Sequence, residues 1–150
     1  MRKIFFVCIV CYTLCLSGCG VTKRAMVSNS ANLTGYNYAI ITDVISYSGS
    51  AALMDMEVKV YDALSATRLQ VIGNGQVGQL SDTQRQQLLI VRFFASQNNE
   101  ESVVGINFVD YMTGKPIASC KGAYSSGSTK EKEMITAIDN AIAQIKASFK

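Results

Sequence analysis

Side chains that could perform acid–base or nucleophilic chemistry are sparse in this 150-residue chain. It contains no histidine, which excludes the usual Ser-His-Asp and Cys-His nucleophile systems and imidazole metal sites. A pair of carboxylates could still hydrolyse a glycosidic bond. The aspartates that could supply such a pair are scattered, with no spacing that brings two together: Asp43, Asp55, Asp62 and Asp110. Asp43 and Asp110 lie near expected strand ends, where a carboxylate more often caps a turn or pairs with a lysine. We therefore expect no catalytic residue and no metal site.

A glycine-rich segment, Gly73-Asn74-Gly75-Gln76-Val77-Gly78, matches the G-x-G-x-x-G pattern of dinucleotide-binding turns. That chemistry requires the turn to open a substantial apolar-faced helix, with an acidic side chain about 20 residues later at the end of a strand. Here the segment that follows is short and polar, and Glu100 and Glu101 fall in an expected turn. We interpret the segment as a flexible surface loop and expect no bound nucleotide.

The tyrosines offer a second kind of chemistry, an aromatic surface for a glycan or a peptide. Six of them lie beyond residue 35: Tyr36, Tyr38, Tyr47, Tyr61, Tyr111 and Tyr124. Tyr36 and Tyr38 are expected to share one face of a strand, and Tyr111 and Tyr124 to lie on neighbouring strands. These four are the candidate ligand-binding residues. The alternative is that they are half-buried packing groups with a hydrated hydroxyl, as is common for tyrosine in strands.

The elements that must position these residues follow from periodicity. Strands are expected at 36–44, 69–72, 88–96, 102–112 and 117–125, and a short helix at 82–87 behind the capping box Ser81-x-x-Gln84. A longer helix from residue 51 has one apolar face, made by Leu53, Met56, Val60, Ala63, Leu64 and Thr67. A C-terminal helix follows the capping box Ser128-x-x-Glu131. Its apolar stripe is Ile135, Ile138, Ile142, Ile145 and Phe149, with Ala137, Ala141 and Ala143 alongside.

The resulting order is β-α-β-(short α)-β-β-β-α. Packing both amphipathic helices on one sheet would bury both apolar stripes. We therefore expect an α+β fold with a single, mostly antiparallel sheet and the two main helices on one face.

The first nineteen residues differ in character from the rest. Arg2 and Lys3 precede an apolar run, Ile4 to Leu16, that is shorter than the roughly 20 residues needed to span a bilayer. A basic start, a short apolar core and small residues before a cleavage point are typical of a secretory signal. Leu16-Ser17-Gly18-Cys19 resembles the lipobox of bacterial lipoproteins, position for position. The alternative is an ordinary cleaved signal followed by a chance cysteine.

The lipobox resemblance implies cleavage between Gly18 and Cys19, with a diacylglycerol and an N-acyl chain on Cys19 and no other cofactor. The chain then divides into a signal peptide (1–18), a lipidated N-terminus with a flexible tether (19–35) and an α+β domain (36–150). In lipoproteins an aspartate after the lipidated cysteine commonly retains the protein in the inner membrane, and Gly20 stands there instead. The implied location is the inner leaflet of the outer membrane, facing the periplasm.

Cleavage also changes the cysteine count and the charge. Of five cysteines only Cys120 would remain unmodified, so a packed core rather than a disulfide must hold the fold. Cys120 stands in an alternating run and is expected to be a buried small apolar residue. Loss of Arg2 and Lys3 leaves 12 basic against 11 acidic side chains. Nucleic-acid binding would require basic residues clustered on one face, and the sequence shows no such cluster, so we expect no nucleic-acid partner.

A second resemblance covers most of residues 36–149. Two strands around Asp110-Tyr111-Met112-Thr113-Gly114-Lys115, followed by the C-terminal helix, are similar to an α+β domain of other envelope proteins. That domain is shared by the curli-secretion lipoprotein, the amino-terminal domain of the Tol translocation protein and lipoprotein activators of peptidoglycan synthases. No functional residue transfers from them.

The lipobox resemblance, with the absence of histidine and of any recognisable catalytic constellation, leads us to expect a non-enzymatic envelope lipoprotein that binds another envelope protein. A glycan- or peptide-binding module that uses the tyrosines is the alternative, and a carboxylate hydrolase comes third.

Overall fold

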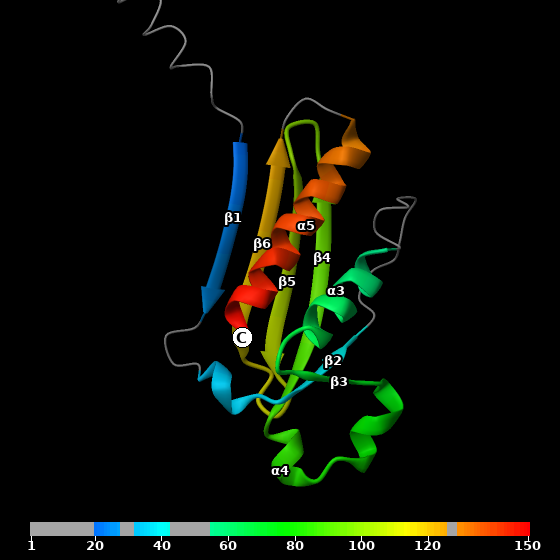
Figure 1. The fold of residues 1–150 in the computed structure, drawn as a ribbon, viewed down its shortest axis with the longest axis vertical. Coiled ribbons are helices and arrows are strands. Elements are labelled where there is room, and N and C mark those ends of the chain that lie inside the picture. Colours follow the sequence, from blue (N-terminus) through cyan, green and yellow to red (C-terminus); the bar gives the residue numbers. More distant parts are fainter. Residues whose placement is uncertain (1–19, 28–31, 43–54, 126–128) are drawn as a thin grey trace, which may run out of the picture.

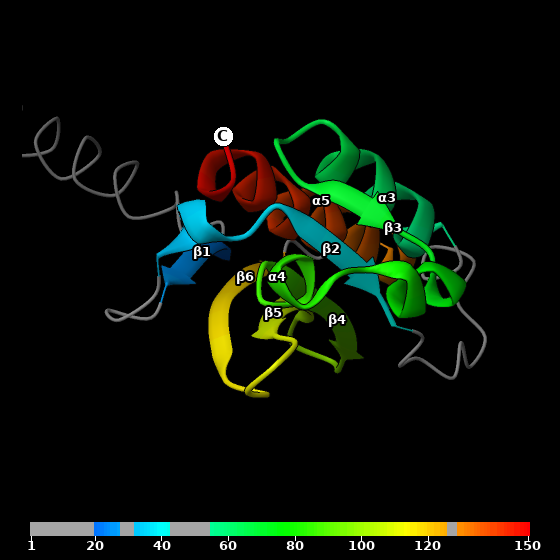
Figure 2. The same cartoon turned by 90° about the horizontal axis from the view of Figure 1, so that it is seen from below.

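The computed structural model describes residues 20–27, 32–42, 55–125 and 129–150. They form one six-stranded mixed sheet with the strand order β1-β6-β5-β4-β2-β3. The helices α3 (Met56–Ser65) and α5 (Lys130–Ser148) pack together on one face of this sheet (Figures 1 and 2). The predicted α+β class, with both main helices on one face, is confirmed.

The parallel half of the sheet is built around β2 (Tyr38–Ile41), which runs parallel to β3 (Gln70–Ile72) and to β4 (Leu88–Gln97). Helix α3 connects β2 to β3 along the chain. The 3-10 helix η2 (Asn74–Gln79) and the short helix α4 (Asp82–Arg85) connect β3 to β4. The predicted capping box is present, because the Ser81 side chain accepts a hydrogen bond from the Gln84 backbone N–H.

The antiparallel half is a meander of β4, β5 (Ser102–Asp110) and β6 (Pro116–Ser125). Alternate side chains point to the helices, so Val91, Phe93, Ile106 and Phe108 are buried in the core. In the turn between β5 and β6, Gly114 has φ of 68°, a conformation that favours glycine. The three strands begin and end within two residues of the predicted ranges.

Residues 20–27 contradict the predicted flexible tether. They form β1 (Gly20–Val27), which pairs antiparallel with β6 so that Gly20 lies opposite Ser125 and Val27 opposite Ala118. The free edge of β6 presents unpaired backbone groups, and pairing with β1 satisfies them. Lysine and arginine within the segment are typical of an edge strand, which charge protects from further pairing. The sheet therefore begins at the residue after Cys19.

Helix α5 is capped one residue later than predicted. Thr129 is the N-cap, and its side chain accepts a hydrogen bond from the Lys132 backbone N–H. The predicted cap, Ser128, lies outside the described residues. Glu131 and Glu133 stand in the first turn and Lys146 in the last, which suits the helix dipole at both ends.

The face that α5 buries is rotated from the predicted stripe. Ile138, Ile145 and Phe149 are buried as expected, but Ile135 is 38% exposed. Met134 is buried in its place, beside Ala137 and Ala141, which were predicted to flank the stripe. The rotation follows from close packing on Gly122 of β6, where an added Cβ would collide with the Ala137 carbonyl and lie 2.5 Å from the Ala141 nitrogen. Small residues at the contact decide which face of the helix turns inward.

Two other packing predictions are confirmed. On α3, Met56, Val60, Ala63 and Leu64 are buried, while Leu53 lies outside the described residues. Cys120 is 1% exposed and belongs to the core. Burial raises the pKa of its thiol to about 11, against the opposing effect of a hydrogen bond with Ser148.

Candidate functional site

The structure does not place Tyr36 and Tyr38 on a shared surface. Tyr36 packs against the core beneath the helices, whereas Tyr38 packs against a separate cluster formed by Ile40, Ile72 and Leu88. The Tyr38 hydroxyl accepts a 3.0 Å hydrogen bond from the Gln84 side-chain amide. The predicted common face is wrong because β2 begins at Tyr38, so that Tyr36 lies before the strand and outside its alternation.

Tyr111 and Tyr124 also lie far apart. Tyr124 is the cross-strand partner of Ser102, at the start of β5, and it packs against the core. Tyr111 follows the end of β5 and is 37% exposed. The length of β5 separates the two by roughly 30 Å at about 3.3 Å per residue. The four candidate tyrosines therefore form no common binding surface.

Tyr36 takes part in a structural hydrogen-bond cluster. Its hydroxyl donates a 2.8 Å hydrogen bond to Asp110 Oδ2, and Asp110 Oδ1 accepts 2.7 and 2.8 Å hydrogen bonds from the backbone N–H and hydroxyl of Thr113. Of the two roles expected for Asp110, a turn cap or a partner of lysine, the structure shows the turn cap. Burial would raise the Asp110 pKa, but the hydrogen bonds to Thr113 and Tyr36 outweigh it, and the pKa is lowered. Burial, the hydrogen bond and the Asp110 charge raise the Tyr36 pKa to about 12.

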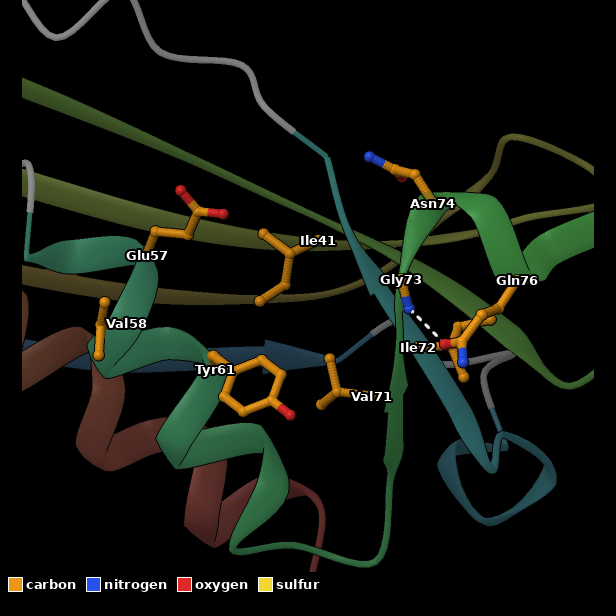
Figure 3. A pocket seen from close by; sticks show the side chains of 9 residues that line it. All are labelled: Ile41, Glu57, Val58, Tyr61, Val71, Ile72, Gly73, Asn74 and Gln76. Atoms are coloured by element: carbon orange, nitrogen blue, oxygen red, sulfur yellow. Dashed lines mark hydrogen bonds between the residues drawn. The ribbon is translucent and has the colours of Figure 1, made fainter.

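An open groove of about 700 Å³ lies between α3, the ends of β2 and β3 and the start of η2 (Figure 3). Its walls are mostly apolar, and two side-chain amides and a carboxylate stand among them. The lining residues are Ile41, Glu57, Val58, Tyr61, Val71, Ile72, Gly73, Asn74 and Gln76. Among these, Glu57 is the single carboxylate, so the groove lining lacks the pair that glycoside hydrolysis uses.

Two side chains of α3 expose apolar surface in the groove that a partner could bury. Val58 is 62% exposed and Tyr61 is 50% exposed, although both belong to a helix with a well-buried opposite face. The Tyr61 ring is turned towards Val71 of β3 (Figure 3). An aromatic ring beside aliphatic side chains, with amides within the same groove, suits a ligand that has both apolar and hydrogen-bonding groups.

The groove was not predicted from the sequence. Tyr61 was considered only with the other tyrosines, and Val58 was not a candidate residue. A signal was present, because the two residues are apolar, lie three apart and fall outside the apolar face of the predicted helix. The lining contributed by β2, β3 and η2 depends on long-range packing that the sequence pattern does not show.

The glycine-rich segment forms one end of the groove and lies at the surface as predicted, but it is helical and not a loop. Residues 74–79 are a 3-10 helix, and the Gly73 backbone N–H donates a 2.8 Å hydrogen bond to Gln76 Oε1. The helix that follows, α4, has only four residues and none of them is buried. This differs from the long apolar-faced helix of a dinucleotide site.

A sheet edge runs beside the groove. β3 is the last strand in the order, so none of the described strands pairs with its outer side. The Gln70 N–H donates a 2.8 Å hydrogen bond to the Asn37 carbonyl, towards β2. Because backbone groups alternate in direction along a parallel strand, the N–H and C=O of Val71 point to the outer edge. An extended chain could pair with them.

In the part of the chain that the structure describes, no cluster of three or more His, Cys, Asp or Glu side chains offers a metal site. Among the helices of the same residues, none has the length and hydropathy of a membrane span.

Comparison with known proteins identifies no family. No family model matches the sequence, and no curated protein matches it. Among solved structures, two of the PelC dodecamer from Paraburkholderia phytofirmans are similar. A PelC variant in space group C2 is 18% identical with a TM-score of 0.48, covering 85% of this chain and 99% of that one. PelC in space group P6 is 18% identical with a TM-score of 0.49, covering 86% and 97%.

A PDZ domain protein from Parabacteroides distasonis is also similar in structure. It is 8% identical with a TM-score of 0.55, and the match covers 89% of this chain but 38% of that one. At this identity the similarity reports a shared fold and nothing about ligands or activity.

Proposed function

We propose that this protein is a non-enzymatic envelope lipoprotein whose domain binds another envelope protein through the groove between α3 and β3. The observation that carries the proposal is the groove itself, with the exposed Val58 and Tyr61 beside an outer edge of β3 that no described strand covers. Exposed apolar side chains gathered in a concave site favour a macromolecular partner over solvent.

The chemistry of the groove favours a protein segment in particular. An extended peptide could pair its main chain with the outward N–H and C=O of Val71 and place an apolar side chain against Tyr61, as in recognition by strand addition. The amides of Asn74 and Gln76 offer further hydrogen bonds. Since β3 has only three residues, side-chain contacts in the groove must supply most of the affinity.

A glycan is the second candidate ligand. Tyr61 with the amides of Asn74 and Gln76 combines an aromatic surface with polar groups, a combination that suits a sugar ring. Against this, the groove lining contains one tyrosine only, and the four tyrosines first considered lie elsewhere.

The membrane anchor is the other half of the proposal. The lipobox resemblance at Leu16-Ser17-Gly18-Cys19 supports lipidation of Cys19 and location in the inner leaflet of the outer membrane, facing the periplasm. Two or more acyl chains give stable anchoring. In Cys19→Ala we expect the unprocessed chain to accumulate and lipid labelling to disappear. Unchanged processing and membrane fractionation of this variant would contradict the anchor.

The binding half is tested by crosslinked capture from the native envelope. Truncation of an aromatic side chain at the centre of a contact commonly costs at least 2 kcal/mol, so Tyr61→Ala should reduce capture of the specific partner about thirtyfold. Tyr111→Ala is the matched control, because Tyr111 is exposed but is not part of the groove. Equal loss in both variants, or no loss in Tyr61→Ala, would contradict the groove as the binding site. Capture of a carbohydrate instead of a protein would favour the second candidate.

A further inference from the structure

The face of the sheet opposite the helices carries a distinct set of side chains. Alternation along the meander turns Arg92 and Phe94 of β4, Asn107 of β5, and Ser119 and Lys121 of β6 away from the helix-covered core. We call these five residues the open face. Both α3 and α5 lie on the other side of the sheet (Figure 2).

The charge of the open face has one sign. Arg92 and Lys121 are both exposed, and the outward positions of the meander, residues 90–96, 103–109 and 119–125 taken alternately, include no Asp or Glu. An anionic surface would complement these two cations.

Exposed apolar side chains accompany the cations. Phe94 is 47% exposed and lies over Gly105, where an added Cβ would collide with its ring. Met26 of β1, the cross-strand partner of Ser119, is 55% exposed. Cations interspersed with aromatic and aliphatic side chains are typical of surfaces that lie in the headgroup region of a membrane.

We propose that the open face rests on anionic phospholipid headgroups, with Arg92 and Lys121 bound to lipid phosphates and Phe94 inserted among the headgroups. The inference rests on the proposed anchor at Cys19. Because β1 begins at Gly20, an anchored Cys19 adjoins the sheet with no intervening tether. In the strand register Lys121 lies opposite residue 24, four residues along β1 from Gly20, about 13 Å at 3.3 Å per residue. Anchoring therefore holds this face within reach of the leaflet.

The chain has no tryptophan, so a single introduced indole can report its own depth. The lipidated full-length mature chain carrying Phe94→Trp is placed on vesicles of phosphatidylglycerol or of phosphatidylcholine, each containing brominated lipid. We expect blue-shifted, quenched emission on phosphatidylglycerol and unquenched emission on phosphatidylcholine. Quenching should weaken as salt is raised, because salt screens the attraction.

Two further variants complete the test. Tyr61→Trp, on α3 at the other side of the sheet, is the control and should remain unquenched on both vesicles. Adding Arg92→Glu and Lys121→Glu to Phe94→Trp should abolish the quenching on phosphatidylglycerol, since each basic side chain contributes roughly a fivefold preference for an anionic surface.

Retention on the vesicles with an unquenched residue-94 indole would overturn the open-face proposal and leave the groove function standing. Equal quenching at positions 94 and 61 would also overturn it, since the domain would then have no preferred face. A chain that is not retained on vesicles at all would contradict the anchor and the proposal together.

Discussion

The Tyr36 hydroxyl and the Asp110 carboxylate tie the segment before β2 to the turn after β5. The strand pattern was sufficient to predict the turn-capping role of Asp110, because the residue stands where an alternating run ends. It could not predict Tyr36 as the partner, since the two residues are 74 positions apart in the chain.

Tyr36→Phe removes the donor from this charged hydrogen bond and should lower the free energy of unfolding at pH 7 by about 1.5–3 kcal/mol. Folding raises the Tyr36 pKa from 10.0 to about 12, so the stabilisation is complete below pH 10 and disappears as the pH rises towards 12. Urea unfolding of both proteins at pH 7 and at pH 11.5 measures this difference. A deficit in Tyr36→Phe that is as large at pH 11.5 as at pH 7 would contradict the assignment.

Cys120 should be nearly inert in the folded mature chain. Cys120 is 1% exposed, and burial raises the pKa of its thiol to about 11. At pH 8 the reactive thiolate is therefore a small fraction of the thiol, and it is shielded from solvent. We expect alkylation by iodoacetamide to be at least about a hundredfold slower in buffer than in urea. Mass spectrometry of both reactions measures the ratio. Fast alkylation of the folded chain would show that α5 does not cover β6 as described.

Whole elements were predicted to different degrees. The strands of the meander and the buried face of α3 could be predicted from the sequence, because their hydrophobic periodicity is strong and local. β1 was not predicted, because a short run with two adjacent basic residues has the composition of a polar linker. Its pairing depends on the free edge of β6, which the local sequence does not show. The rotation of α5 was missed because periodicity alone cannot distinguish Ile135 from Met134, and contact with Gly122 decides between them.

Gly122→Ala tests the close contact between α5 and β6. The new Cβ would meet the backbone of Ala137 and Ala141, so the helix must shift as a whole, and we expect a loss of about 2–4 kcal/mol. Gly75→Ala is the control, because nothing lies within 4 Å of a Cβ added at Gly75. Thermal unfolding followed by circular dichroism measures both variants. If their melting temperatures fall equally, the packing at Gly122 is not as described.

At the scale of the whole molecule, the sequence predicts an α+β fold with one sheet, and the structure confirms it. It does not predict the strand order, because pairing between distant strands depends on which edges are left free after local packing. The groove depends on that order: β3 must be the last strand for its outer edge to lie open beside α3. The proposed membrane contact of the open face likewise needs β1 next to β6, because this pairing places Gly20, the residue after Cys19, beside the meander. Both proposed binding surfaces therefore depend on the strand order of the sheet and not on a sequence motif.

Site-specific photocrosslinking in living cells tests the binding groove most directly. A photoreactive amino acid at Val58, which lines the groove, is compared with one at Met112, which is 54% exposed on the turn between β5 and β6. We predict a discrete protein adduct from position 58, none from position 112, and loss of the adduct when Tyr61→Ala is added. No protein adduct from position 58, or an equal adduct from position 112, would contradict the account.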